Sequence, residues 1–126
     1  MPSKLIKIDE DSFEFCTSLT NITLPNSIQE IGRSAFYSCD SLENLTIPKN
    51  IKKLGRLFAG NTNVNLTFED TSGWQKRYVT VSNNYYGDWE DVDPSVMADS
   101  NAFKNLMKTE YKDSDGNVYY YEFQKV

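Results

Sequence analysis

The chain has 126 residues and a formal net charge of −5, and 39 % of its residues are hydrophobic and 13 % aromatic. That length is enough for one ordinary domain or for two small ones that support each other. The lysines and arginines are not clustered, which argues against nucleic acid or an anionic membrane as a partner, because counterion release requires concentrated positive charge.

The composition also restricts the catalytic chemistry. The sequence contains no histidine, which removes Ser-His and Cys-His nucleophile pairs, the HExxH zinc helix and most catalytic zinc sites. It contains no GxGxxG and no GxxxxGK[ST] motif, which removes the familiar phosphate-binding loops. We therefore expect a protein that is not an enzyme and that uses no cofactor and no metal.

The N-terminal segment has no hydrophobic signal core. It reads MPSKLIKIDED, and the longest apolar runs of the chain are only a few residues long. We therefore expect no segment to enter a membrane. Either the protein is cytoplasmic or a secretion signal has been removed.

The first half of the chain contains an internal repeat. Residues 13–32 and 36–55 align at a displacement of 23 residues. A period of about 20 to 29 residues with apolar residues at constant offsets predicts a leucine-rich-repeat solenoid, in which stacked coils of the chain bury a shared interior. The same register extends back to Leu5 and Ile8, so the chain is expected to start in the middle of a coil. The matched pairs are Phe13/Phe36, Cys16/Cys39, Ser18/Ser41, Leu19/Leu42, Ile22/Leu45, Leu24/Ile47, Pro25/Pro48, Ile28/Ile51, Ile31/Leu54 and Gly32/Gly55.

Each coil is predicted to contain two short extended stretches. In the first, residues 21–24, the apolar Ile22 and Leu24 point inward and the polar residues that alternate with them point outward. The second, residues 27–32, buries its isoleucines and is expected to turn at Gly32, where a positive φ is cheap for glycine.

The remaining part of the coil is predicted to return to the start of the next one. Asp9 occupies the place of Gly32 in the first partial coil and is expected to tolerate the same turn geometry. Residues 35–39 have apolar side chains spaced by one helical turn, so a short helical or 3₁₀ turn is expected to close the coil.

Stacked coils place equivalent outward side chains in rows. Opposite charges side by side in such a row contribute about 0.2 to 1 kcal/mol per pair, and the alternation of charge in one row supports the register. The predicted rows are Asn21, Asn44 and Asn65; Thr23, Thr46 and Thr67 on the same sheet; and Lys7, Glu30 and Lys53 on the other sheet.

The third coil is incomplete. From Gly55 the pattern continues with a loss of two residues, and it stops at Phe68. A solenoid needs a terminal cap to cover its last apolar cross-section. We therefore predict repeats over residues 1–68 and a capping module over residues 69–126. The expected equivalents in the third coil are Phe58 for Phe36, Val64 for Leu42, Leu66 for Leu45 and Phe68 for Ile47.

The repeat pattern FxxCxSLTxIxLPxSIxxIGxxAFxxCxSL resembles the BspA-like leucine-rich repeats of bacterial surface proteins. The later LTFEDTSGW and DPS, with the tyrosine-rich end, resemble the segment that closes some proteins of this type. The resemblance implies export, surface attachment and adhesive binding of host proteins or other cells. The missing signal suggests that the chain is a C-terminal piece of such a protein. The matching positions include Pro25, Ile28, Ile31, Gly32, Ala35, Phe36, Cys39, Ser41 and Leu42.

Residues 69–126 have no repeat and are rich in aromatic residues. Alternation typical of strands occurs in WQKRYVTVS and in VYYYEFQKV. A helix is expected at about residues 99–109, started by Asp99 and Ser100; Asp93 or Ser95, with Pro94 at the first position, is the alternative helix start. The segment DSDGN predicts a turn before the last strand. The second half is therefore predicted to be a small aromatic-rich α+β cap.

The two cysteines are expected to lie one coil apart. At that spacing of about 5 Å, parallel side chains hold their β-carbons beyond the range of about 3.5 to 4.5 Å that a disulfide prefers. We therefore favour free thiols at Cys16 and Cys39 that act as small hydrophobic groups, with a disulfide as the alternative.

Two acidic segments have features of cation sites. Asp113, Asp115 and Asn117 match the first ligand positions of a calcium loop, but Gly116 comes one place early and Gln124 replaces the bidentate carboxylate, so a plain hairpin turn is favoured. The second segment offers calcium ligands or a paired-carboxylate glycosidase site, against which we favour a solvated acidic loop. It contains Asp88, Glu90, Asp91 and Asp93.

Two surfaces are candidate binding sites. The first is the outward polar face of the repeat sheet, because solenoids offer concave regular faces to partners; a merely solvated face is the alternative. The second consists of Tyr85, Tyr86 and Trp89, which have rings suited to sugar faces or protein interfaces. Alternatively these rings form the core of the cap with Trp74, which is expected to be buried over Phe68 and Leu66. The first surface comprises Asn21, Thr23, Asn44, Thr46, Asn65 and Thr67.

These observations favour a non-catalytic binding module of a bacterial cell-surface or secreted adhesion protein, with a host or cell-surface protein as its partner. The alternative is a carbohydrate-binding or carbohydrate-processing module that uses the C-terminal aromatics on a surface glycan. Neither involves nucleic acid or insertion into a membrane. Leu5, Ile8 and Phe13 lie in the incomplete first coil, whose apolar end and open strand edge predict a homo-oligomer.

Overall fold

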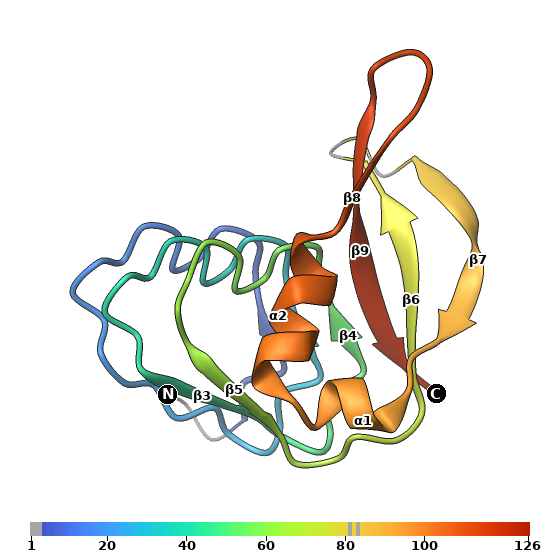
Figure 1. Ribbon diagram of the computed structural model, residues 1–126. Coiled ribbons are helices and arrows are strands. Elements are labelled where there is room, and N and C mark those ends of the chain that lie inside the picture. Colours follow the sequence, from blue (N-terminus) through green and yellow to red (C-terminus); the bar gives the residue numbers. More distant parts are fainter. Residues whose placement is uncertain (1–3, 81, 83) are drawn as a thin grey trace.

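The computed structural model describes residues 4–80, 82 and 84–126. Within that range, short strands of the first half lie beside the longer strands and the two helices of the second half (Figure 1). The elements are β1 (Lys7–Ile8), β2 (Glu30–Ile31), β3 (Asn44–Ile47), β4 (Lys53–Leu54), β5 (Asn65–Phe68), β6 (Trp74–Val79), β7 (Tyr85–Asp91), α1 (Pro94–Met97), α2 (Ser100–Lys108), β8 (Glu110–Lys112) and β9 (Val118–Lys125).

Residues that are 23 apart in the first half lie side by side. Strands β1, β2 and β4 pair in parallel, so that Lys7 lies opposite Glu30 and Glu30 lies opposite Lys53. Strands β3 and β5 also pair in parallel and align their asparagines, leucines and threonines. These pairings confirm the predicted repeat register, and we refer to the units that start at Asp9, Gly32 and Gly55 as the first, second and third repeat.

The two residues that the third repeat lacks fall between Thr62 and Asn65. The backbone N–H of Cys39 donates to the Thr62 hydroxyl at 3.2 Å, which keeps the displacement of 23 residues. Asn44 then lies opposite Asn65, at a displacement of 21 residues. The shortened turn therefore ends before β5 and leaves that strand in register with β3.

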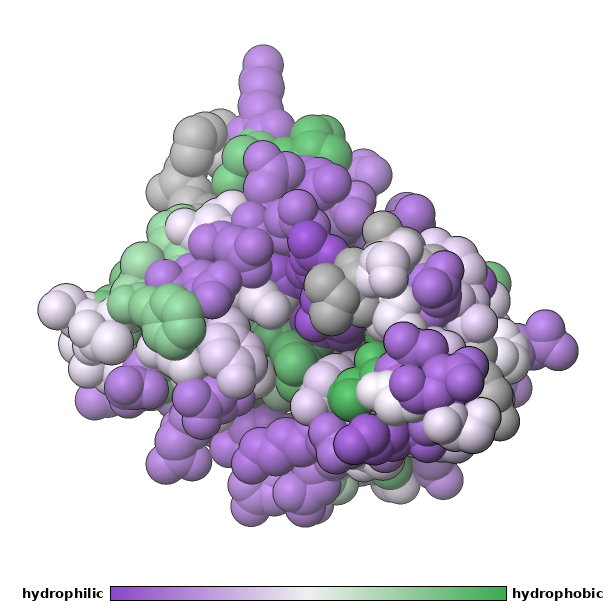
Figure 2. Space-filling model, turned by 90° about the horizontal axis from the view of Figure 1, so that it is seen from above, coloured by the Kyte–Doolittle hydropathy of each residue, from purple (hydrophilic) through white to green (hydrophobic). Residues whose placement is uncertain are grey.

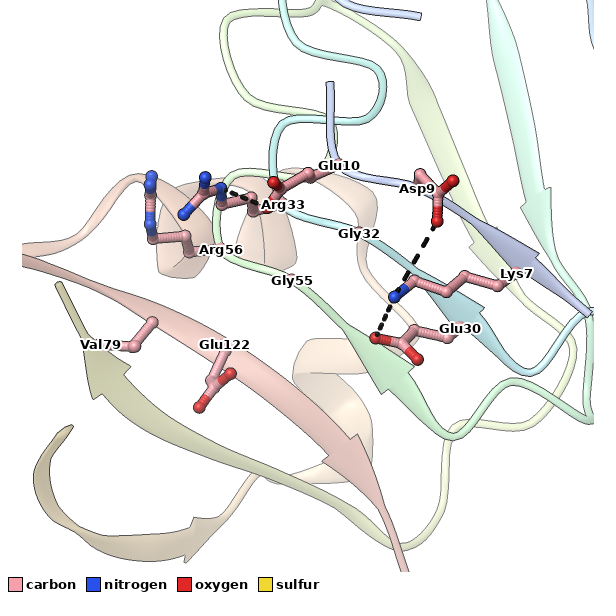
Figure 3. A pocket seen from close by; sticks show the side chains of 10 residues that line it. All are labelled: Lys7, Asp9, Glu10, Glu30, Gly32, Arg33, Gly55, Arg56, Val79 and Glu122. Atoms are coloured by element: carbon pink, nitrogen blue, oxygen red, sulfur yellow. Dashed lines mark ion pairs between the residues drawn. The ribbon is translucent and has the colours of Figure 1, made fainter. Parts of the chain in front are cut away.

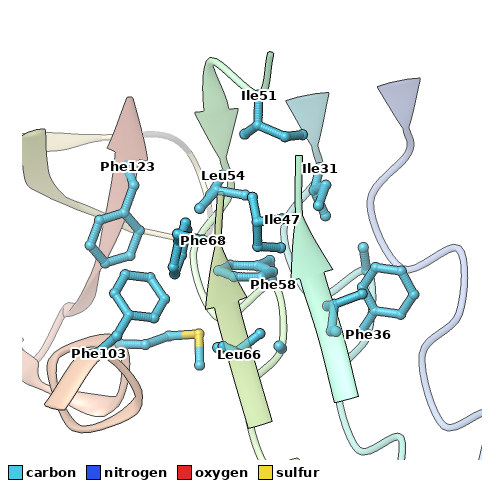
Figure 4. Close-up of a cluster of buried hydrophobic side chains, with 14 of the residues drawn as sticks. Ile31, Phe36, Ile47, Ile51, Leu54, Phe58, Leu66, Phe68, Phe103 and Phe123 are labelled. Carbon is cyan, nitrogen blue, oxygen red and sulfur yellow. The ribbon is translucent and has the colours of Figure 1, made fainter. Parts of the chain in front are cut away.

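The inward side chains of the repeats form one continuous core (Figure 4). The ring of Phe13 stacks on that of Phe36, with centroids 5.3 Å apart and an interplanar angle of 1°. Phe36 and Phe58 are completely buried, as expected for interior positions of successive repeats. The other large, fully buried residues in this part of the core are Ile28, Ile31, Leu42, Leu45, Ile47, Ile51 and Leu54.

The turn after each short strand differs from the prediction. Gly32, Gly55 and Asp9 do not adopt a positive φ; the left-handed conformation occurs two residues later, and again four residues after that. Glycine is required for a different reason, because a Cβ on Gly32 would lie 2.4 Å from the backbone nitrogen of Glu10. The left-handed residues are Asp11, Phe15, Ser34, Ser38, Leu57 and Asn61.

The return segment of each repeat forms single turns and not the expected helical or 3₁₀ turn. One such turn is closed by the N–H of Tyr37 and the carbonyl of Ser34, at 3.1 Å. Alternate N–H groups donate to the neighbouring repeat instead, as from Phe36 to the carbonyl of Phe58 at 2.6 Å. The positive φ of Ser34 and Ser38 interrupts the helical path, so hydrogen bonds between repeats replace those within a helix.

The C-terminal segment extends one sheet of the repeats. Strand β4 pairs antiparallel with β9, β9 pairs with β6, and β6 pairs with β7. Among the described residues, seven strands form this mixed sheet, in the order β1-β2-β4-β9-β6-β7 with β8 attached to β9. The last repeat therefore continues directly into the second half of the molecule.

The other predicted elements of the second half are present. Strands β6 and β9 occupy the two alternating segments, the predicted turn joins β8 to β9, and α2 lies in the predicted range. Asp99 caps α2 by accepting the N–H of Ala102 at 3.1 Å, and Asp93 caps α1 through the N–H of Ser95 at 2.9 Å. The two helix starts that we give as alternatives therefore both begin a helix, α1 and α2. The acidic segment for which we expect a loop forms β7 instead, because its backbone pairs with β6.

Helix α2 covers the last repeat with an aromatic side chain. The ring of Phe103 lies 4.9 Å from those of Phe68 and Phe123 and 6.1 Å from that of Phe58, measured between centroids. Trp74 is only 2 % exposed, and its ring lies 5.5 Å from that of Phe68. This confirms the predicted burial of Trp74 at the end of the repeats.

Polar contacts of Asp70 hold the start of the C-terminal segment in place. Its backbone carbonyl accepts the indole N–H of Trp74 at 2.9 Å, and its carboxylate pairs with the ammonium group of Lys125 at 2.8 Å. The hydrogen bond from Lys125 and those from Ser72 hold the pKa of the Asp70 carboxyl well below its usual range. Asp70 therefore connects Trp74, near the start of the C-terminal segment, with Lys125, near its end.

Candidate functional site

The outward asparagines and threonines form a regular polar face. Side chains of Asn44, Thr46, Asn65 and Thr67 are exposed, and the amide of Asn65 donates to that of Asn44 at 3.4 Å. An isolated parallel bridge connects Asn21 to Asn44 and brings the first repeat into the same row. Thr23 is also exposed but lies outside the strands. We name the six aligned residues, which include Asn21 and Thr23, the Asn/Thr face.

A groove opens on the Asn/Thr face where the first repeat separates from β3. Pairing between the two segments ends after the bridge at Asn21, because residues 22–24 form no strand. The hollow has a volume of about 470 Å³ and includes Asn21, Thr23, Asn44 and Thr46 in its lining. Its floor includes the partly buried Ile22 and the buried Leu24. The structure thus combines outward amide and hydroxyl groups with an apolar floor.

The aromatic candidates of the second half surround a cation. The guanidinium carbon of Arg77 lies 3.6 Å from the ring centroid of Tyr85 and 4.3 Å from that of Trp89. Arg77 also pairs with Glu122 at 2.9 Å. One face of each ring is therefore already in contact with Arg77. Tyr86 pairs with Tyr78 through the backbone of β7, but its side chain lies outside the described part of the structure.

The mixed sheet brings this aromatic cluster onto the same face as the charged row of the repeats. Gln124 lies opposite Lys53 and also opposite Gln75, so Lys53 and Arg77 project from the same side of the sheet. Two hollows of about 540 Å³ and 220 Å³ occupy this side, and both are lined by Glu30, Gly55 and Glu122. We name the combined hollow the junction groove, defined by Lys7, Glu30, Arg33, Arg56, Arg77 and Glu122. Figure 3 shows the larger of the two hollows, with all of these residues except Arg77.

Ion pairs link most charges of the junction groove. The ammonium group of Lys7 lies 3.7 Å from the Glu30 carboxylate and 4.0 Å from that of Asp9. Arg33 pairs with Glu10 at 2.8 Å. Burial, and secondly the neighbouring charge of Arg33, lower the pKa of Arg56. The alignment of Glu10, Arg33 and Arg56 can be predicted from the sequence, because these residues are spaced at 23-residue intervals.

Four tyrosines form a second aromatic cluster that the sequence did not single out as a group. The rings of Tyr78 and Tyr121 stack with centroids 4.0 Å apart, and Tyr111 lies 5.8 Å from Tyr78 and 5.7 Å from Tyr119. Tyr78 and Tyr121 lie opposite each other on β6 and β9. Burial, and secondly a hydrogen bond with Tyr78, raise the pKa of Tyr121. This cluster supports the hairpin and lies on the sheet face opposite to Arg77.

Both cysteines are free thiols, as predicted. Cys39 is completely buried, and its thiol donates to the carbonyl of Phe13 at 3.0 Å. Burial raises the pKa of the Cys39 thiol, which disfavours the nucleophilic thiolate. The geometry thus supports a packing role for this residue.

The acidic residues of β7 and the nearby Asp93 do not converge on one point. Glu90 pairs with Lys76 at 3.6 Å, Asp91 accepts a hydrogen bond from Gln75 at 3.1 Å, and Asp93 caps α1. Asp88 is exposed. The segment therefore contributes partners to β6 and α1, and its carboxylates do not face each other as a glycosidase pair does.

The predicted turn at residues 113–117 is organised by Asp113. One oxygen of its carboxylate accepts the N–H groups of Asp115 and Asn117, and the other accepts the Asn117 amide and the Tyr119 hydroxyl. Gly116 has a φ of 85°. These contacts confirm the hairpin turn. No group of three or more Cys, Asp or Glu side chains suited to a metal ion occurs in the described part of the chain.

The exposed surface is largely hydrophilic on the side seen in Figure 2, and apolar side chains there form separate patches. In the described residues, no helix has the length and apolar character needed to cross a bilayer.

A family model described as the BspA type leucine-rich repeat region (6 copies) matches residues 1–72. Neither the curated proteins nor the solved structures compared with the chain gave a match.

Proposed function

The chain belongs to the BspA-type leucine-rich repeat family, and we propose that it is a non-catalytic protein-binding module of a bacterial cell-surface or secreted adhesion protein. In this proposal residues 1–68 form a leucine-rich solenoid and residues 69–126 are its cap. The partner is a host protein or a protein of another cell. Binding requires neither a cofactor nor a metal.

The observation that carries the proposal is the Asn/Thr face with its groove. Strands β3 and β5 hold the side chains of Asn44, Thr46, Asn65 and Thr67 at fixed spacing, so a partner binds these groups without first ordering them. The groove of about 470 Å³ adds an apolar floor to this polar surface. Such a combination suits an interface with an apolar centre and a polar rim.

The test is a comparison of two variants on a panel of purified extracellular matrix proteins. We expect that the double variant Thr23→Lys, Thr46→Lys abolishes binding, because two long charged side chains enter the groove, and that Trp89→Ala preserves it. Thr17→Lys is the matched control, since Thr17 is exposed and lies outside the groove lining. Unchanged binding by the double variant, with its fold intact by circular dichroism, contradicts the proposal.

One observation favours the alternative of a glycan-binding module. Tyr85 and Trp89 both line the smaller hollow of about 220 Å³, next to several polar side chains. Their contacts with Arg77 occupy one face of each ring, which leaves less surface for stacking on a sugar. Binding on a glycan array that is lost in Trp89→Ala and kept in the Thr23→Lys, Thr46→Lys variant supports this alternative.

A further inference from the structure

The stacking of the repeats places three charged side chains in a row at one wall of the junction groove. Glu10, Arg33 and Arg56 follow directly after Asp9, Gly32 and Gly55. The backbones approach so closely there that a Cβ on Gly55 would lie 2.2 Å from the nitrogen of Arg33. Successive side chains of the row therefore emerge close together and on the same side, as Figure 3 shows for the two arginines.

Arg56 is the cation of this row that has no carboxylate beside it. Arg33 pairs with Glu10 at 2.8 Å, and across the groove Arg77 pairs with Glu122 at 2.9 Å. Among the residues that the structure describes, no carboxylate lies within ion-pairing distance of Arg56. The Arg56 side chain is partly buried and stands next to a second guanidinium group. The carboxylates of Glu10 and Asp11 raise the pKa of Arg56, but burial and the charge of Arg33 lower it by more.

The space in front of Arg56 is open. Arg56 lines the hollow of about 540 Å³, whose other wall includes Val79 and Glu122. The adjoining hollow of about 220 Å³ continues the groove towards Tyr85 and Trp89. The whole groove is therefore longer than a single carboxylate and is suited to an extended chain.

We propose that the junction groove binds an acidic segment of a partner protein and that Arg56 receives one of its carboxylates. A guanidinium group matches a carboxylate with two parallel N–H···O bonds. A carboxylate at this point gives Arg56 the partner that Glu10 gives Arg33. Lys7, Arg33 and Arg77 are paired internally and Lys53 is exposed at the other end of the groove, so the partly buried Arg56 fixes where the acidic side chain sits. This site is separate from the Asn/Thr face. If the junction groove does not bind an acidic segment, the proposed function of the Asn/Thr face is therefore unaffected.

The test uses acetylated hexaglutamate peptide as the probe and hexaglutamine as the neutral control, with affinity measured by calorimetry. We expect hexaglutamate to bind the wild-type protein and hexaglutamine not to bind. Arg56→Gln should weaken hexaglutamate binding at least about tenfold, because hydrogen bonds between charged groups are lost. Arg56→Lys should weaken it less, since the charge remains but the planar fork does not.

The matched control is Lys104→Gln, which removes the same charge from α2 on the opposite side of the sheet. It should leave hexaglutamate affinity unchanged. Titration of the wild-type protein should shift the NMR signal of the Arg56 Nε–H, a readout that does not depend on the folding of any variant. Thr46→Lys should not alter this binding.

Several results overturn the proposal. They are the absence of hexaglutamate binding to the wild-type protein, equal affinity in Arg56→Gln, an equal loss in Lys104→Gln, or an Arg56 signal that does not move. Tighter binding of polygalacturonate than of hexaglutamate also overturns it, because the carboxylate source would then be a glycan.

Discussion

Gly32 and Gly55 determine how closely the backbones of neighbouring repeats approach. Neither has a positive φ, so their conformational freedom is not the reason for glycine at these positions. The reason is contact, because a Cβ at Gly55 would lie within 2.7 Å of three backbone atoms of the preceding repeat. The same contact brings Glu10, Arg33 and Arg56 together and so creates one wall of the junction groove.

The substitution Gly55→Ala should therefore destabilise the protein. Backbone atoms cannot move aside as a flexible side chain can, so we expect overpacking to lower the free energy of unfolding by about 1 to 3 kcal/mol. Denaturant unfolding measures this change. Glu43→Ala, at an exposed position, serves as the control and should change stability by less than about 0.5 kcal/mol. Equal stability of Gly55→Ala and the wild type would show that the repeats can separate at this point.

At the scale of elements, α2 covers the open edge of β5. The backbone N–H of Leu66 donates to the hydroxyl of Ser100 at 2.9 Å, a hydrogen bond that a further repeat would otherwise supply. Phe103, one turn further along the helix, packs on Phe68. The helix thus satisfies both the polar edge of the strand and the apolar end of the core.

Ser100→Ala tests this role of the helix. Removal of the hydroxyl leaves the N–H of Leu66 without its acceptor, which should lower the free energy of unfolding by about 1 to 2 kcal/mol. Hydrogen exchange at the Leu66 amide should become faster, while that at Thr46 should change little. Asn101→Ala, on the exposed side of the same helix, is the control. Unchanged exchange at Leu66 would mean that another group caps this edge.

For the whole molecule, the central feature is that one sheet runs through both halves of the chain. Leu54 of the last repeat lies opposite Phe123 of β9, and both belong to one hydrophobic cluster that extends from Ile8 to Phe123. The repeats and the C-terminal segment thus bury their apolar surfaces against each other. We expect the two halves to unfold together for this reason.

Phe103→Ala tests this coupling. Its completely buried ring contacts rings from both halves, so the variant should lose about 3 to 5 kcal/mol of stability. Tryptophan fluorescence and far-ultraviolet circular dichroism should still report one coincident transition. Phe15→Ala, at a position 62 % exposed, should cost less than about 1 kcal/mol. Two separate transitions would contradict the coupling.

Much of the fold could be predicted because its signals are periodic or local. The 23-residue period predicts the neighbours of Glu30 and Asn44, and the alternation in β6 and β9 predicts strands. Capping residues predict α2, and the alternative helix start at Asp93 is where α1 begins. Strand β7 was missed because acidic residues and Gly87 are typical of loops, whereas pairing with β6 overrides that preference.

In the candidate sites, too, some features can be predicted from the sequence and others depend on the fold. The members of the Asn/Thr face follow from the repeat, since each occupies an outward position of the repeat pattern. The groove within that face does not, because it depends on where pairing with the first repeat ends. Nor does the contact of Arg77 with Tyr85 and Trp89, which requires the pairing of β6 with β7.

The sequence by itself determined which residues of the repeats stack and which of them point inward, because residues that are one period apart must occupy equivalent positions when the units pack on each other. Only the tertiary structure decided that β9 pairs with β4 and that the row Lys7, Glu30 and Lys53 lies on the same face of the sheet as Arg77 and Trp89. No periodic pattern in the sequence indicates this pairing. It depends on which strand buries the most apolar surface against the last repeat while its edge is paired, and this is a property of the whole chain.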